Sequence, residues 1–83
     1  MRHATPATLA TIPDLLAQIR KLPLREPKPG TFYIKGSAFL HFHEDPAGLF
    51  ADLKVEGAWK RLKADTKAQR KALVQAASRA IAR

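Results

Sequence analysis

The spacing of apolar residues predicts a helix near the start of the chain. Five aliphatic residues recur at intervals of three and four positions: Ile12, Leu15, Leu16, Ile19 and Leu22. This spacing puts them on one stripe of a helix. Thr11 is suited to cap this helix, Pro13 to occupy its first turn, and Pro23 to stop it.

The segments on either side of this helix have no such spacing. Residues 1–10 carry no apolar stripe, and we expect them to form a loose tail. Residues 24–30 include Pro27 and Pro29, and each proline fixes φ and removes a backbone N–H donor. We therefore expect an extended, polyproline-like connector over residues 24–30.

From Thr31 onwards apolar and polar residues alternate, which is typical of β-strands. Residues 31–35 and 38–43 predict a β-hairpin across Gly36-Ser37. Glycine at the first turn position permits the positive φ of a type II′ turn.

The register of this hairpin decides which face carries the histidines. A two-residue turn at Gly36-Ser37 pairs Phe32 with His41. A loop one residue longer groups four apolar residues on one face: Phe32, Ile34, Leu40 and Phe42. It leaves five residues on the other face: Tyr33, Lys35, Phe39, His41 and His43. Turn chemistry favours the first register, but we expect the second, because burying one apolar face is the stronger energetic demand.

The rest of the chain predicts two more strands and a final helix. Residues 45–48 have the composition of a turn, and residues 49–55 then alternate as a third strand. Its inward residues are Leu49, Ala51, Leu53 and Val55, and its outward residues include Asp52 and Lys54. Residues 58–63 predict a short edge strand, whose lysines discourage further pairing. Thr66 and Gln69 have the spacing of a capping box, and an apolar stripe follows: Leu73, Ala76, Ala77, Ala80 and Ile81.

Together these elements predict an α+β fold of the order α-β-β-β-(β)-α. We expect an antiparallel meander sheet with the N- and C-terminal helices packed on one face, forming a single domain over residues 1–83. The chain has no cysteine, so a disulfide framework and a thiolate metal site are excluded. No apolar run approaches the roughly 20 residues that span a bilayer. Met1-Arg2-His3 leads into no continuous apolar segment, so we expect no secretory signal. We expect a cytoplasmic protein without membrane contact.

Positive charge is concentrated in the last third of the chain. The net charge is +8, and residues 59–83 carry eight basic residues against Asp65 alone. Such a field favours polyanions, and aromatic residues on an open sheet face can stack bases. The candidate nucleic-acid-binding residues are Lys60, Arg61, Lys63, Lys67, Arg70, Lys71, Trp59, Tyr33 and Phe39.

Two histidines alternate along the second strand of the predicted hairpin. His41 and His43 on one face place two imidazoles about 7 Å apart at their α-carbons. Imidazole is a good ligand for zinc, copper and nickel. Glu44 or Asp45 is the candidate third ligand if the strand bends after His43, because His3 lies on the predicted tail. The alternative is a pair of strand histidines that are hydrogen-bonded to their neighbours.

Three classes of function stay open. The favoured one is a small interaction module that binds nucleic acid or another polyanion through its basic C-terminal region. The second is a metal-binding or hydrolytic site, in which Asp45 or Asp52 orients His41 or His43 as a general base. The chain has neither a cysteine nucleophile nor a glycine-rich phosphate loop, so we expect a non-enzyme without a cofactor. The third is a homodimer that buries the open aromatic face of the sheet, without any ligand.

One stretch of the sequence resembles known proteins. AFLHFHEDPAGLFADL, followed by a W-x-R element and a Thr-capped basic helix, is similar to a family of small uncharacterised bacterial proteins. The resemblance covers the chain from about Leu9 to Ala82. It implies a compact α+β domain of the bacterial cytoplasm, and it carries over no site residue.

Overall fold

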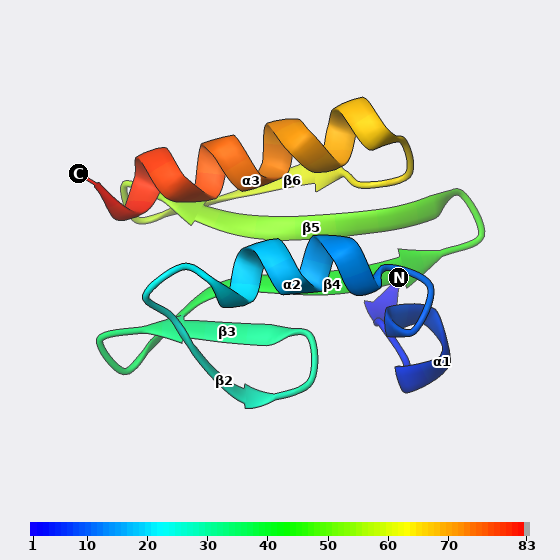
Figure 1. The fold of residues 1–83 in the computed structure, drawn as a ribbon, viewed down its shortest axis with the longest axis horizontal. Coiled ribbons are helices and arrows are strands. Elements are labelled where there is room, and N and C mark those ends of the chain that lie inside the picture. Colours follow the sequence, from blue (N-terminus) through cyan, green and yellow to red (C-terminus); the bar gives the residue numbers. More distant parts are fainter. Residues whose placement is uncertain (83) are drawn as a thin grey trace.

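The protein is one antiparallel sheet with helices on one side of it (Figure 1). The computed structural model describes residues 1–82. The elements follow the chain in the order β1 (Arg2–His3), α1 (Pro6–Leu9), α2 (Pro13–Arg20), β2 (Arg25–Lys28), β3 (Thr31–Ile34), β4 (Ser37–Asp45), β5 (Gly48–Val55), β6 (Ala58–Lys63) and α3 (Lys67–Ile81). The predicted α+β class and antiparallel meander are confirmed.

Strands β2 to β6 lie side by side in the order of the chain, each antiparallel to the next. The short strand β1 also pairs with β4, with Arg2 opposite Glu44 and His3 opposite His43. Strand β3 pairs with β4 only as far as Thr31 and His41. At His43, β5 pairs with one side of β4. Strand β1 pairs with the other side, beyond the end of β3 and in line with it.

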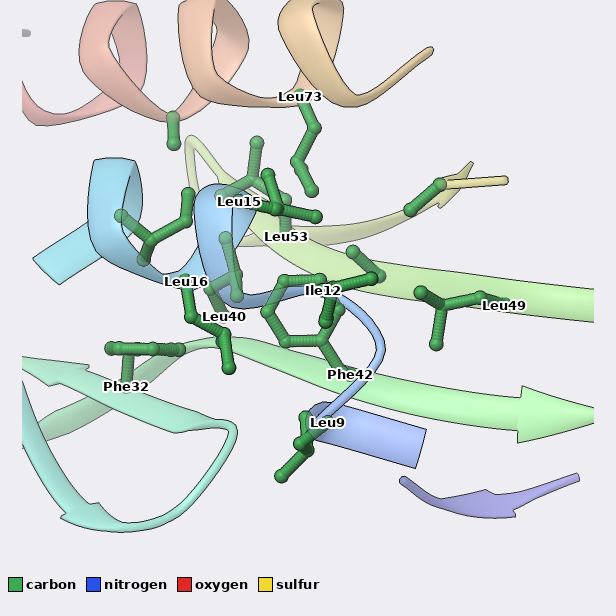
Figure 2. Packing of buried hydrophobic residues seen from close by; sticks show 14 of the residues in the cluster. Leu9, Ile12, Leu15, Leu16, Phe32, Leu40, Phe42, Leu49, Leu53 and Leu73 are labelled. Carbon is green, nitrogen blue, oxygen red and sulfur yellow. The ribbon is translucent and has the colours of Figure 1, made fainter. Parts of the chain in front are cut away.

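One hydrophobic core fills the space between the sheet and its helices, which confirms that both main helices cover the same face. Figure 2 shows side chains of α2 and α3 meeting those of β4 and β5. The labelled residues of this contact include Leu15, Leu16, Leu73, Leu40, Phe42 and Leu53. Burying these apolar surfaces, at about 25 cal/mol per Å², is the main stabilising contribution.

The hairpin of β3 and β4 satisfies both the turn chemistry and the burial of one apolar face, which favoured different registers in the sequence. The turn residues are Lys35 and Gly36, with φ of 51° and 78°, so the predicted turn at Gly36-Ser37 is wrong by one residue. Positive φ at both positions is typical of a type I′ turn, which matches the twist of the strands. A bulge then shifts the register, and Phe32 pairs with Leu40. Phe32 and Leu40 therefore share the apolar face, as the register with the longer loop predicts.

The bulge also corrects the predicted place of Phe39. This residue lies between the paired positions Ala38 and Leu40, and its side chain is only 4% exposed. A bulge leaves one residue outside the regular ladder and re-aims its side chain. Phe39 therefore belongs to the core cluster and not to the exposed aromatic surface that the sequence predicted.

The predicted loose tail is ordered, which is a further correction. The backbone N–H of Thr5 donates to Glu44 Oε1 at 2.6 Å, and that of Ala4 donates to the Phe42 carbonyl at 3.0 Å. Leu9 is 5% exposed and joins the core. Residues 1–10 are thus held by hydrogen bonds of their backbone N–H groups and by one buried side chain. Neither kind of contact produces a periodic pattern in the sequence, so the sequence did not predict this order.

The predicted connector over residues 24–30 contains the edge strand β2. Arg25 pairs with Tyr33 and Lys28 with Thr31, with an irregularity between the two pairs. Pro27 is tolerated there because an edge strand leaves one side of its backbone unpaired.

The starts of the two main helices differ in how well the sequence predicted them. The capping box of Thr66 and Gln69 is confirmed at the start of α3. At α2 the cap position is Ile12, without a side-chain hydrogen bond, and Thr11 instead donates its hydroxyl to the Thr8 carbonyl at 2.6 Å. Among residues 1–82, no helix combines the length and apolar character needed to cross a membrane.

Candidate metal centre

The face of the sheet opposite the helices carries the histidines. Strand alternation sends Leu40 and Phe42 into the core and therefore turns His41 and His43 to the other side. In cross-strand rows on this face, His41 lies opposite Asp52 and Asp52 opposite Arg61. We call this surface the open face.

Strand β1 brings the third histidine to the same place. His3 is the direct partner of His43 in the β1–β4 pairing, and its ring stacks on that of His43 with centroids 4.7 Å apart. Its ring centroid is 5.6 Å from that of His41. All three histidines of the chain are therefore gathered in one cluster, made of His3, His41 and His43.

The ring nitrogens of this histidine cluster converge. One nitrogen from each ring lies within 4.8 Å of the other two. The closest pair is His41 Nδ1 and His43 Nε2, at 2.8 Å. A tetrahedral zinc ion, with Zn–N bonds of about 2.0–2.1 Å, separates its nitrogen ligands by roughly 3.3 Å. The spacing that such an ion requires falls within the range observed here.

A carboxylate lies beside the cluster and is fixed in place. Asp52 Oδ2 is 3.3 Å from His43 Nε2. Arg61 donates to both oxygens of Asp52, through Nε at 2.9 Å and through a terminal nitrogen at 3.0 Å. The hydrogen bonds from Arg61 lower the pKa of Asp52, although partial burial opposes them. Asp52 is therefore an oriented anion at neutral pH.

The histidines of β4 are held in the neutral form. Partial burial lowers the pKa of His41, and the positive charge that His43 acquires on protonation lowers it further, while Asp52 opposes both. The pKa of His43 is also lowered, mainly by burial. A neutral imidazole offers the lone pair of one ring nitrogen to a metal ion. His41 Nδ1 and His43 Nε2 share a hydrogen bond, so one of them carries the proton, and coordination through both requires that ring to change tautomer.

An exposed aromatic ring borders the cluster. Trp59, on the edge strand β6, is 45% exposed, and its ring centroid is 4.7 Å from that of His41. Lys54 places its ammonium nitrogen 5.0 Å from the centroid of the Trp59 ring. The indole is the only one in the chain and is thus a built-in reporter of the site.

Asp45 does not join the cluster, although the sequence made it a candidate third ligand. Its Oδ1 accepts a hydrogen bond from the Ala47 N–H at 2.9 Å, and its Oδ2 lies 3.7 Å from the amino group of Met1. Asp45 therefore stabilises the turn between β4 and β5. The third nitrogen comes from His3 instead, which the sequence placed on a loose tail.

The structure separates the candidate nucleic-acid-binding residues onto two sides of the molecule. Trp59, Arg61 and Lys63 alternate onto the open face, whereas Lys60 lies opposite the core residue Leu53. Three basic residues of α3 lie on the helix side, where they line a groove of about 630 Å³ between α2 and α3: Lys67, Arg70 and Lys71. Tyr33 is partly buried and Phe39 is in the core. The basic residues of the helix and the exposed indole of Trp59 therefore lie on different sides of the molecule.

Three of the basic residues in that set already have partners: Lys63 lies 3.9 Å from Asp65, and the other two are Arg61 and Arg70. Arg61 is engaged by Asp52, as described above, and Arg70 Nε donates to the Ala64 carbonyl at 2.9 Å. Asp14 also lines the groove between α2 and α3, so its charge is mixed.

No family model, no curated protein and no solved structure matches the chain. The resemblance to a family of small bacterial proteins therefore stays a prediction.

Proposed function

We propose that the protein binds a divalent transition-metal ion through His3, His41 and His43. The observation that carries this proposal is the convergence of three ring nitrogens within 4.8 Å on the open face. Three imidazoles are the protein ligands of a common class of zinc sites, and they also suit copper and nickel.

The way the cluster is assembled supports the proposal. Two of the histidines lie on the central strand β4, whose position is fixed by pairing on both sides. The third comes from β1, which is held to β4 by the Arg2–Glu44 and His3–His43 pairs. A site on paired strands holds its ligands more precisely than a site on loops.

Asp52 places a carboxylate beside the ion, and Arg61 shares the charge of this carboxylate. Its Oδ2 is close to His43 Nε2, which is also the nitrogen nearest to His41. Arg61 keeps this carboxylate in one orientation, as partners of metal-site carboxylates commonly do. Asp52 therefore stabilises the bound ion, and Arg61 acts through Asp52.

The test is equilibrium dialysis of the protein against zinc, with the metal content measured per chain. We expect one ion per chain for the native protein. The variants His3→Ala, His41→Ala and His43→Ala should each bind zinc at least about tenfold more weakly, since each loses a direct ligand.

Asp45→Asn is the matched control, because Asp45 was a ligand predicted from the sequence and lies on the same strand. It should keep its zinc. A native protein that retains no zinc at micromolar concentration would refute the proposal. An Asp45→Asn protein as weak as His3→Ala would refute the ligand set.

A further inference from the structure

We infer that the metal ion at the histidine cluster takes a phosphoryl oxyanion as an external ligand. This inference rests on the proposed metal binding and adds what the bound ion would recognise. Three protein ligands leave at least one coordination position of a zinc ion open. His3 is exposed, so an open position at this cluster is accessible from solvent.

The charge of the bound ion also favours an anionic ligand. Three neutral imidazoles compensate none of the charge of a divalent ion. The adjacent carboxylate, Asp52, is already paired with the guanidinium of Arg61 through two hydrogen bonds. The ion together with this pair therefore keeps a positive charge close to that of the free ion, and an anionic ligand lowers its electrostatic energy.

Lysine side chains on the open face add positive charge near the histidine cluster. Lys54 and Lys63 alternate onto this face from β5 and β6, in the rows on either side of Asp52 and Arg61. Lys28 on β2 is close enough for its charge to act on His41. Lys63 is also 3.9 Å from Asp65, a long contact that compensates its charge only partly. Lysine is a common phosphate-binding residue because its ammonium group adapts to the position of the anion.

The source of the phosphoryl group is either free phosphate or a nucleotide. Trp59 can distinguish the two, because only a nucleotide has a base that can stack on the indole. Its indole is 45% exposed and borders His41. Stacking of a base on an aromatic side chain contributes roughly 1–3 kcal/mol in single-strand binders. A nucleotide would thus gain a contact that inorganic phosphate lacks.

The experiment is calorimetric titration of the full chain, with and without zinc, using inorganic phosphate and adenosine monophosphate as probes. Zinc content is measured before and after each titration. We expect the zinc-loaded protein to bind phosphate at least tenfold more tightly than the metal-free protein. Tighter binding of the nucleotide that is lost in Trp59→Ala supports the oxyanion site and identifies a nucleotide as its source. Equal binding of both probes supports the site with free phosphate as the source.

Two double variants test where the phosphate binds. Each removes two positive charges, but from opposite sides of the molecule. Lys54→Ala with Lys63→Ala acts on the open face, and Lys67→Ala with Lys71→Ala acts on the helix side. The first should weaken phosphate binding at least about fivefold with zinc content unchanged, and the second should leave it within twofold. Equal losses would overturn the assigned location.

The inference and the metal proposal fail in different ways. A protein that keeps its zinc but binds neither probe, or binds them equally well without zinc, overturns the oxyanion inference and leaves metal binding intact. A protein that retains no zinc overturns both.

Discussion

His3 lies directly opposite His43 across the β1–β4 pairing, and the two rings stack with an interplanar angle of 29°. Because His41 is two residues before His43 on the same strand, this single pairing gathers all the imidazoles of the chain. The position of a two-residue strand therefore determines whether a metal site exists.

Copper binding should quench the fluorescence of Trp59. The indole centroid is 4.7 Å from that of His41, so a paramagnetic ion bound by His41 would lie within quenching range of the only tryptophan. Fluorescence titrated with Cu²⁺ should fall and reach a plateau at one equivalent. His41→Ala should need at least about tenfold more copper, and an unchanged titration curve in that variant would contradict the assignment.

Zinc should slow hydrogen exchange at Ala4. Its N–H donates to the Phe42 carbonyl and follows β1 directly, so an ion that joins His3 to His41 and His43 also ties this bond to β4. Local opening near a terminus controls such exchange. We expect at least a tenfold slowing by NMR at one equivalent of zinc, and none in His3→Ala. Equal slowing in both proteins would show that His3 is not a ligand.

The ion pair of Glu26 and Arg20 should make stability depend on pH in the acid range. Arg20 donates to both oxygens of Glu26, at 2.7 and 2.9 Å, and the Gly30 N–H donates to Glu26 at 3.1 Å. The hydrogen bonds from Arg20 lower the pKa of Glu26 in the folded state. The stabilisation is therefore present above the pKa of the unfolded chain, near 4.3, and is lost as pH falls through the lower folded pKa.

Glu26→Gln should consequently reduce the free energy of unfolding at pH 7 by about 1 kcal/mol, a modest figure because Arg20 is half exposed. The difference from the native protein should disappear near pH 2, as measured by urea denaturation. A constant difference across this range would contradict the assigned pair.

Gly48 should tolerate alanine less well than Gly57. Both have positive φ, of 134° and 80°, but a Cβ at Gly48 would lie 2.5 Å from Asp65 Oδ2, whereas Gly57 has no atom within 4 Å of such a Cβ. Asp65 Oδ1 also accepts the Leu49 N–H at 2.8 Å, so moving the carboxylate costs that bond. We expect losses of roughly 2–3 kcal/mol for Gly48→Ala and about 1 kcal/mol for Gly57→Ala by chemical denaturation. Equal losses would show that Asp65 moves freely.

Much of the fold could be predicted because its signals are local. The strand over residues 58–63, the capping box of Thr66 and Gln69, and the apolar stripe ending at Ile81 are all confirmed. Each depends on the spacing of neighbouring residues. The hairpin was harder, because the bulge at Phe39 serves the turn and the core at once, and no local pattern shows where a bulge is placed.

The candidate site could be predicted only in part. Alternation along β4 correctly put His41 and His43 on one face, away from the core. The third nitrogen could not be found this way, because His3 reaches them through pairing across some forty residues of chain. The contact of Thr5 with Glu44 is equally long-range. The only signal in the sequence was the presence of a third histidine.

The most direct test of the metal site is a long-range ¹H–¹⁵N NMR spectrum of the histidine rings, recorded before and after one equivalent of zinc at neutral pH. We expect one ring nitrogen in each of His3, His41 and His43 to shift strongly and to stop changing beyond one equivalent. Shifts confined to one or two rings, or none, would contradict the three-histidine site.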